Sequence, residues 1–486
     1  MSSVEPNLPS SPEKNDYKQM VDMTEVNDRI AVLMPVSNLI VHGQAMDVIK
    51  FHEPEQQEAY QALIALLQQL HPADVARILE SLPVDERLLV WRLAGPEDDG
   101  EVLLEVSDAV RETLIEGMTK AELLAAMSDL NTDELAELAH DLPRQVVYAA
   151  LSTLDEKERA QVAAALSYEE DQVGTLMDFE FVSIRADVSC EVVLRYLRRF
   201  EDLPDHMDKI FVVDEDSILK GVLPIRKLLV ADPENIVADV MATDVVMFQP
   251  EDDVEEAALA FERYDLVTAP VVDANQKLIG RITVDEMVDV IREESATDIM
   301  NMAGMKEEED LFAPVIDSVK NRWMWLAINL CTAFVASRVI GVFEGSIEKI
   351  VALAALMPIV AGIGGNSGNQ TITMIVRAIA MGQMQMGQSF KLWRKELGVA
   401  VLNGLVWGTV MGCVAWLLYG SFELGAVMVS AMTLNLALAA TMGVLIPVTM
   451  QKFGKDPALG SSVMITAVTD SGGFFIFLGL ASLILL

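Results

Sequence analysis

One acidic side chain stands in an apolar run near the end of the chain. Asp470 occurs in the sequence Ile465-Thr-Ala-Val-Thr-Asp-Ser-Gly-Gly473. An ionisable residue inside a membrane span usually serves an ion or substrate path. The alternative is a carboxyl group that is satisfied locally by Thr466, Thr469 or Ser471, or that is protonated. Because two glycines follow the acid, we favour a cation-binding role for Asp470.

A second polar feature interrupts another apolar run, in the sequence Pro358-Ile-Val-Ala-Gly-Ile-Gly-Gly-Asn-Ser-Gly-Asn-Gln370. We expect this segment not to hold a regular helix in lipid, and irregular backbone at membrane depth must be buried in protein or line water. Its carbonyl groups and amide side chains suit a hydrated cation. The alternative is a kink whose glycines allow close helix packing. We favour a pore, lined by Gly364, Gly365, Asn366, Gly368, Asn369 and Gln370.

Charge and apolar character are separated along the chain. The 486 residues carry a formal net charge of −39, although 52% of them are hydrophobic. Residues 321–486 hold 9 bases and 6 acids, a net charge of +3, so residues 1–320 carry −42. An acidic soluble part joined to an apolar part excludes a simple globular enzyme, and we expect no catalytic residues. The soluble part has no basic patch, which argues against nucleic-acid binding.

Five apolar segments follow Arg322, and a membrane span needs about 20 such residues. The predicted spans are Trp323–Phe343, Ile350–Ala380, Leu397–Tyr419, Leu424–Thr449 and Ser461–Leu486. Basic residues cluster before the first span, between the second and third, and between the fourth and fifth. Because basic loops stay in the cytoplasm, we expect a multi-pass protein of the cell membrane with a cytoplasmic acidic part. Five spans then place the C-terminus outside.

The acidic part begins with a polar extension and a helical domain. We expect residues 1–54 to be mostly disordered, although Ile30–Leu33 and Leu39–Val41 are apolar enough to dock. Residues 55–173 show short helical periods divided by turns such as Leu82-Pro83. This pattern predicts an acidic, all-α superhelical domain.

An internal repeat occupies residues 174–300. The sequence Phe211-Val-Val-Asp-Glu-Asp-Ser-Ile-Leu-Lys-Gly221 matches Pro270-Val-Val-Asp-Ala-Asn-Gln-Lys-Leu-Ile-Gly280 at a spacing of 59 residues. Each copy reads as helix, apolar strand, turn, strand and helix, which predicts an α/β fold. The tandem repeat resembles a CBS-domain pair. The predicted boundaries are 174–240 for the first copy, 241–300 for the second, 301–322 for a connecting (plug) helix and 323–486 for the transmembrane domain.

This order of domains, together with the GGNSGNQ segment and Asp470, resembles the MgtE family of magnesium transporters and channels. The resemblance implies a homodimer in the lipid bilayer with a Mg²⁺ pore on the two-fold axis, and Asp470 as its selectivity site. Mg²⁺ dehydrates reluctantly and needs few protein carboxylates. The ion's water molecules would contact the residue 366–370 amides, Thr466 and Thr469, which joins both threonines to the predicted pore lining.

The resemblance also implies regulatory Mg²⁺ sites on the acidic part, which close the pore when cytosolic Mg²⁺ rises. The matching positions are Glu101, Asp133, Glu137, Asp265, Glu286, Asp289, Glu294, Asp298 and Asp456. Glu137 and Glu286 stand where aspartate is expected, and Thr297 stands where an acid is expected. Any single acid is as readily explained as a solvated surface residue, but the whole set favours binding.

Some family members bind ATP in the CBS pair. In this chain the sequence Gly221-Val-Leu-Pro-Ile-Arg-Lys227 ends in lysine where a carboxylate would hold the ribose hydroxyls. Lysine cannot accept hydrogen bonds, so we expect no ATP binding in that manner and no cofactor other than Mg²⁺.

Two other functions stay open. One is an ion-coupled secondary transporter that also carries Co²⁺ or Mn²⁺, and the other is a membrane-anchored sensor without transport. Proton coupling usually needs a relay of intramembrane acids or histidines, and a mere anchor needs no polar break. Both considerations favour a Mg²⁺ channel or transporter.

Overall fold

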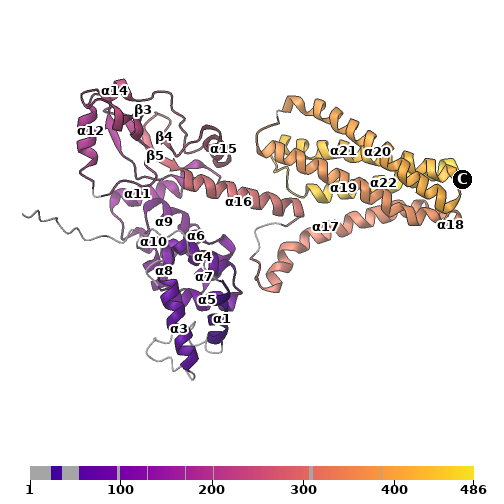
Figure 1. Cartoon of the computed structure of the whole chain (residues 1–486), viewed down its shortest axis with the longest axis horizontal. Helices are drawn as coiled ribbons and strands as arrows, with labels where there is room; N and C mark the ends of the chain where they lie inside the picture. The colour runs from indigo at the N-terminus through magenta and orange to yellow at the C-terminus, as the bar shows by residue number, and fades with distance from the viewer. Residues whose placement is uncertain are drawn as a thin grey trace, which may run out of the picture. The chain divides into compact units, whose positions relative to one another are not determined.

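The computed structural model describes residues 23–34, 54–95, 99–128, 130–169, 171–200, 202–305, 310–384 and 386–486. The chain forms two compact units (Figure 1). The first unit holds the chain up to Ser167 together with Asp310–Phe312, and the second holds Tyr168–Glu309 and Ala313–Leu486.

The described part of the first unit is all helical, as the periodicity predicts. Its helices are α1 (Met23–Leu33), α3 (Pro54–Leu67), α4 (Pro72–Glu80), α5 (Val84–Ala94), α6 (Asp99–Glu105), α7 (Asp108–Glu116), α8 (Lys120–Ala126), α9 (Thr132–Ala139), α10 (Arg144–Leu151) and α11 (Glu156–Ala165). Ile30 and Leu33 of α1 are buried, so this part of the extension is an ordered helix. Leu39–Val41 lies outside the described residues.

Two arginines, Arg87 and Arg111, are buried in equivalent positions 24 residues apart. In each, Nε donates to the backbone carbonyl eight residues earlier, at 2.9 Å for Arg87 and 2.7 Å for Arg111. Carboxylates of Glu137 and Asp141 neutralise Arg111 at 3.2 and 3.0 Å. The first unit therefore contains repeated helix pairs. In each of these two pairs, a buried guanidinium bonds the backbone of the preceding helix.

Arg87 lacks these acids, because Thr113 and Gly117 stand at the equivalent positions. Its counter-charge is Asp310, whose two oxygens accept from Nη1 at 2.7 Å and from Nη2 at 3.0 Å. Burial acts to raise the pKa of Asp310, but the bonds from Arg87 and from the Phe312 amide outweigh it, so the pKa lies below its ordinary value.

The second unit begins with the predicted repeat. Its elements are η3 (Val173–Leu176), β1 (Ser183–Arg185), α12 (Cys190–Leu197), β2 (Lys209–Val213), β3 (Leu219–Pro224), α13 (Ile225–Val230), α14 (Val237–Val240), α15 (Val254–Tyr264), β4 (Thr268–Val272), β5 (Leu278–Thr283) and α16 (Val284–Ala303). The first copy forms a sheet in the order β1-β2-β3, with β1 parallel to β2 and β3 antiparallel to it. The second copy forms the antiparallel pair β4-β5.

Backbone details confirm the repeat. Ser217 and Gln276, one in each copy, both have positive φ, at 64° and 63°. The Leu219 amide donates to the Gln276 carbonyl, and the Leu278 amide donates to the Ser217 carbonyl, both at 3.0 Å. These reciprocal bonds relate the copies by an approximate two-fold axis.

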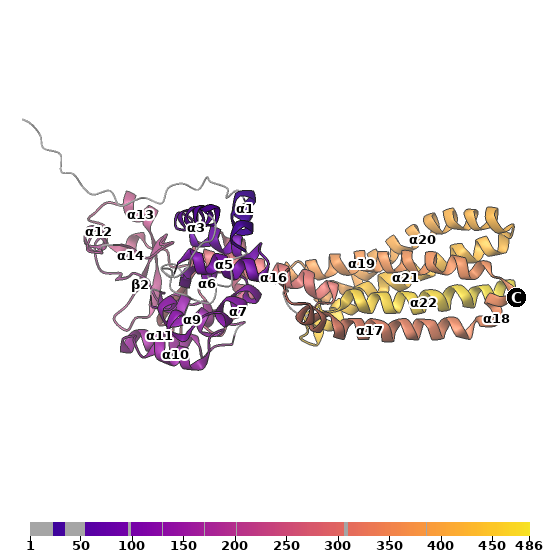
Figure 2. The same cartoon turned by 90° about the horizontal axis from the view of Figure 1, so that it is seen from below.

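The rest of the second unit is a bundle of long helices (Figures 1 and 2). Its elements are α17 (Val315–Val342), α18 (Glu344–Lys349), α19 (Ala352–Ala380), η4 (Met386–Gln388), α20 (Ser389–Tyr419), α21 (Phe422–Lys452) and α22 (Ser461–Leu485). Among the described residues, α17, α20, α21 and α22 are long and apolar enough to cross a membrane. The remaining predicted span, Ile350–Ala380, corresponds to α19, which contains the glycine and amide residues and packs against α21 and α22.

The prediction of irregular backbone at residues 358–370 is wrong. The segment belongs to the continuous helix α19, which passes through Pro358. Gly364 is buried against Asn435 of α21, and Gly368 is buried against Ile465 of α22. The glycines therefore allow close helix packing, the alternative reading of this segment, and the intact helix satisfies its own carbonyl groups.

Residues 301–322 differ from the predicted single connecting helix. α16 ends at Ala303, and Gly304 adopts the left-handed conformation with φ 75°. α17 begins at Val315 and continues without a break into the first predicted span. The described part of the connection therefore comprises the end of α16, the non-helical residues 304–305 and 310–314, and the first turns of α17.

The pair between Arg87 and Asp310 can be tested by substitution. We expect Asp310→Asn to cost roughly 3 kcal/mol of stability in the first unit, because it leaves a buried guanidinium without a counter-charge. Hydrogen exchange of α4 and α5 amides in the full chain would measure the loss. Asp317→Asn is the control, since its ion pair with Lys320 is exposed. Unchanged α4 and α5 protection in Asp310→Asn would show that the pair is dispensable.

Candidate functional site

Asp470 lies within α22, which packs against α17, α19 and α21. The side chain is partly buried, and in the described part of the chain no hydrogen bond or ion pair engages its carboxylate. The Thr466 and Thr469 hydroxyls instead donate to backbone carbonyls within α22, at 2.8 and 2.9 Å. Local satisfaction by these threonines therefore does not account for Asp470, and its oxygens are open to a cation.

The α19 residues predicted to line a pore lie on two faces of the helix. Gly364 and Gly368 are buried against neighbouring helices, and Thr469 of α22 is fully buried as well. A Cβ atom on Gly365 would lie 3.6 Å from Thr469 Oγ1, so the structure brings these two residues together. The exposed or partly exposed members of the set are Gly365, Asn366, Asn369, Gln370 and Thr466. Their role in lining a pore stays a prediction.

A second buried carboxylate lies in the same bundle. α20 begins at Ser389, earlier than the predicted span, and therefore includes Glu396. The Glu396 side chain is 9% exposed and pairs with Lys395 Nζ at 3.0 Å. Unlike Asp470, this acid already has a cationic partner.

A cluster of carboxylates, which we call the acidic cluster, forms where α15, α16 and the loop before α22 meet. Its members are Asp253, Glu255, Glu294, Asp298 and Asp456. Asp253 caps α15, accepting a hydrogen bond from the Glu256 amide at 3.0 Å. Asp456 accepts from Asn301 Nδ2 of α16 at 2.9 Å. Both acids are thereby held in place by neighbouring backbone or side-chain groups.

Repulsion within the acidic cluster changes its protonation. Burial, followed by the charges of Glu255 and Asp298, raises the pKa of Glu294 to about 7. Loss of solvent and the neighbouring Asp253 charge raise the pKa of Glu255, and burial and Asp456 raise that of Asp298. Carboxylates that disfavour one another's ionised form are stabilised by a nearby cation. In the chain as described, no three acidic, histidine or cysteine side chains converge closely enough to enclose one ion directly.

The acidic cluster contains three of the nine predicted regulatory acids, Glu294, Asp298 and Asp456. Sequence analysis missed Asp253 and Glu255. Their signal was the acidic run at residues 251–256, which opens the first helix of the second CBS copy.

The other six predicted acids lie outside the acidic cluster. Asp265 ends α15 with φ 51°, and Asp289 is exposed beside Arg292 at 3.3 Å. Glu137 is bonded to Arg111 in the first unit. The remaining three are Glu286 in α16, Glu101 in α6 and Asp133 in α9. Their regulatory role stays a prediction.

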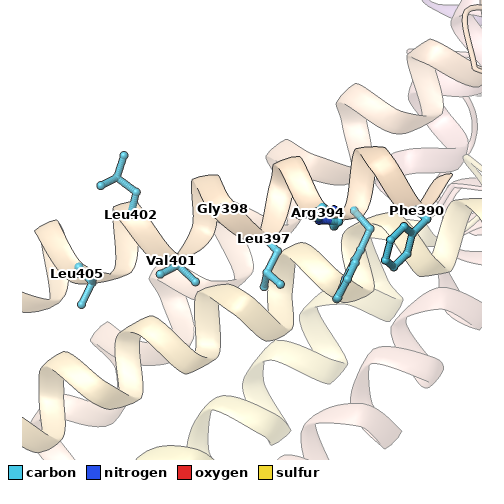
Figure 3. Close-up of a pocket in the computed structure, with 8 residues that line it drawn as sticks. Phe390, Arg394, Leu397, Gly398, Val401, Leu402 and Leu405 are labelled. Atoms are coloured by element: carbon cyan, nitrogen blue, oxygen red, sulfur yellow. The ribbon is translucent and has the colours of Figure 1, made fainter. Parts of the chain in front are cut away.

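A shallow groove of about 580 Å³ runs along α20. All its lining residues belong to this helix, and Figure 3 shows Leu402 pointing away from the side occupied by Val401 and Leu405. The lining is apolar except for the Arg394 guanidinium. A cationic, apolar groove does not suit a metal ion, so the ion path is not placed here.

An apolar helix bundle with an unpaired carboxylate, joined to a CBS pair and an acidic helical domain, is typical of cation-transport proteins. Three family models match the chain. They are MgtE, a divalent cation transporter, at residues 357–480, the MgtE intracellular N domain at residues 70–171, and the CBS domain at residues 237–293.

The chain belongs to the MgtE family. It is 33% identical over 444 residues to the magnesium transporter MgtE of Thermus thermophilus, covering 90% of this chain and 98% of that protein. It is 27% identical over 418 residues to the magnesium transporter MgtE of Bacillus subtilis, covering 86% of this chain and 93% of that protein. A crystal structure of the cytosolic domain of the Mg²⁺ channel MgtE with ATP is 34% identical, covers 48% of this chain and 96% of that one, and gives a TM-score of 0.44.

The raised pKa of Glu294 predicts a pH-dependent stability. A carboxyl whose pKa is raised in the folded state stabilises that state below its ordinary pKa, and this contribution is lost as pH rises through about 7. We therefore expect Glu294→Gln to raise the thermal midpoint of the full chain at pH 8 without divalent ions by roughly 2 °C or more. The gain should shrink at pH 5.

The measurement is a thermal melt of detergent-solubilised protein from pH 5 to 8. Glu262→Gln on α15 is the matched control, because Glu262 is exposed and outside the acidic cluster. If Glu294→Gln and Glu262→Gln behave alike across this range, repulsion within the cluster is not what limits stability.

Proposed function

We propose that this protein is a Mg²⁺ channel or transporter of the cell membrane and that Asp470 holds the permeating ion. The observation that carries the proposal is the unpaired, partly buried carboxylate inside an apolar helix. An ionised intramembrane acid without a partner is unfavourable unless a cation compensates its charge. Support also comes from the magnesium transporters that match this chain over most of their length.

Asp470 suits Mg²⁺ because this ion keeps most of its water shell. Mg²⁺ is commonly bound through one or two carboxylates, while the remaining positions are water. A homodimer would supply two copies of Asp470 about one axis, and amides of the α19 segment could bond the ion's water molecules. The basic loops favour a cytoplasmic acidic part and an external C-terminus.

We further propose that cytosolic Mg²⁺ closes the pore through the acidic cluster. α16 carries Glu294 and Asp298, and its Asn301 is bonded to Asp456 just before α22. The Gly460 amide also donates to the Asn301 carbonyl, at 3.1 Å. The cluster is therefore connected to the helix that carries Asp470. A cation among these acids stabilises the contact between α16 and the start of α22, and so favours the state in which that contact is intact.

The Mg²⁺ ions in the acidic cluster would be bound largely through water. The chemistry of the set fits this, since carboxylate oxygens are the ligands Mg²⁺ prefers and a wider spacing leaves room for its water shell. Their role is electrostatic: they neutralise acids that otherwise repel one another.

The alternative of ion-coupled transport of Mg²⁺, Co²⁺ or Mn²⁺ needs a second titrating group in the bundle. Glu396 is the nearest candidate by chemistry, but its pairing with Lys395 favours a fixed charge. Uptake measured with and without a pH gradient separates the two mechanisms, because only coupled transport responds to the gradient.

Removal of the Asp470 charge tests the ion site. We expect Asp470→Asn to reduce Mg²⁺ uptake into proteoliposomes to the level of protein-free liposomes, because the amide offers no negative charge to replace lost water. Glu423→Gln, an exposed acid at the start of α21, is the control and should transport normally. Undiminished uptake by Asp470→Asn would refute the assignment.

Removal of three acids tests the regulation. We expect the combined substitutions Glu255→Gln, Glu294→Gln and Asp298→Asn to keep Mg²⁺ flux high when internal Mg²⁺ is high, whereas the wild-type flux shuts off. The matched control replaces Glu251, Glu256 and Glu262, exposed acids of the same CBS copy, by glutamine. Normal closure of the first variant would exclude the acidic cluster as the sensor.

A further inference from the structure

Asn435 is a fully buried amide in the middle of α21. α21 packs against both α19 and α22, and the three helices lie side by side in the bundle (Figure 2). The amide lies against Gly364 of α19 and Gly473 of α22. A Cβ atom on Gly473 would stand 2.7 Å from Nδ2 and 3.1 Å from Oδ1, and one on Gly364 would overlap Nδ2. Glycine at both positions therefore makes the space for this side chain.

The orientation of the amide follows from its bond to Val360. Nδ2 donates to the Val360 backbone carbonyl at 2.9 Å, and because a carbonyl only accepts, the nitrogen must face α19. Oδ1 is then a buried acceptor without a donor in the described part of the bundle. Such groups are unfavourable and few in native proteins. An apolar side chain would fill this position without that cost, so packing alone does not account for Asn435.

The amide is next to the part of α22 that carries Asp470. Gly473 follows Asp470 by three residues, so the two are neighbours on the helix surface. On the other helix, Gly364 adjoins Gly365, whose Cβ position is 3.6 Å from Thr469 Oγ1. The contacts of one side chain thus define how closely α19 and the Asp470 segment approach α21.

We propose that Asn435 is a positioning residue for the Asp470 site and sets how strictly that site distinguishes Mg²⁺ from larger divalent cations. The inference rests on the proposed transport function. The bond to Val360 holds α19 against α21. The contact with Gly473 holds α22 against the same point of α21. Together they fix the space between Asp470 and the α19 amides. Mg²⁺ demands near-ideal octahedral geometry, whereas Ca²⁺ accepts irregular shells, so a small displacement weakens the preference for Mg²⁺ first.

The test measures the uptake of Mg²⁺ and of Ca²⁺ into proteoliposomes that contain either the Asn435→Leu variant or the wild-type protein. Leucine keeps the branch at Cγ but removes both polar atoms. We expect the ratio of Mg²⁺ to Ca²⁺ uptake to fall about tenfold or more, because displacement by about 1 Å can cost a hundredfold at a well-oriented site. The thermal midpoint should stay level or rise, since an unpartnered acceptor is removed.

Thr433→Val is the matched control on the same helix. Thr433 donates its hydroxyl to Val429 within α21 and faces Gly404 of α20, away from Asp470. Its uptake ratio should equal that of the wild type. Gly473→Ala is a second variant, which disturbs the same contact from α22 and should lower the ratio as Asn435→Leu does.

A wild-type ratio in Asn435→Leu overturns the proposal, and so does a parallel loss of both uptakes together with a lowered thermal midpoint. If Asn435→Leu does not fold, a wild-type ratio in Gly473→Ala overturns it. Failure of the proposed function has a different signature: the wild-type protein carries no Mg²⁺, and Asp470→Asn changes nothing.

Discussion

The high cost of an uncompensated charge away from water governs how this protein is built. All of its acidic excess is confined to the first 320 residues, and the helix bundle carries few charges. Where charges are buried, the surroundings explain them: Arg87 has Asp310, Arg111 has Glu137 and Asp141, and Glu396 has Lys395. Asp470 departs from this pattern in the described bundle, because it has no protein partner. The same rule that rationalises the paired charges therefore supports the proposal that Asp470 holds an ion.

Polar groups also specify how the bundle packs. In lipid, apolar contacts between helices gain little over contacts with acyl chains, so close backbone approach and interhelical hydrogen bonds determine the arrangement. α19 and α22 both present glycines to α21, and Asn435 occupies the gap between them. The bundle is thus closely packed beside the Asp470 segment. A site that distinguishes ions by a fraction of an ångström needs rigid support of this kind.

The domain order and the element types could be predicted from the sequence because they rest on local signals. The 59-residue repeat between the Gly221 and Gly280 copies, for example, predicts two equivalent strand pairs, and the structure has both. The backbone of residues 358–370 could not be predicted in this way. Glycine and asparagine have poor intrinsic helix propensity, and only the contacts of Gly364 with Asn435 and of Gly368 with Ile465 show why the helix persists. Tertiary packing overrode the local preference.

The acidic cluster also could not be predicted fully from the sequence, because its members come from distant parts of the chain. Three of its acids could be proposed from a family resemblance, but Asp253 and Glu255 lie at the start of α15, far in the sequence from Asp456. Their proximity depends on how the second CBS copy folds against the loop before α22. Asn301 makes this connection, because its side-chain amide donates to Asp456 and its backbone carbonyl accepts from the Gly460 amide.

Burial and neighbouring carboxylates raise the pKa of Glu294 to about 7, close to neutral pH. A bound proton removes a negative charge from the acidic cluster, as a metal ion compensates one. In the proposed regulation, protonation of Glu294 and binding of Mg²⁺ therefore act in the same direction, because each reduces the repulsion within the acidic cluster.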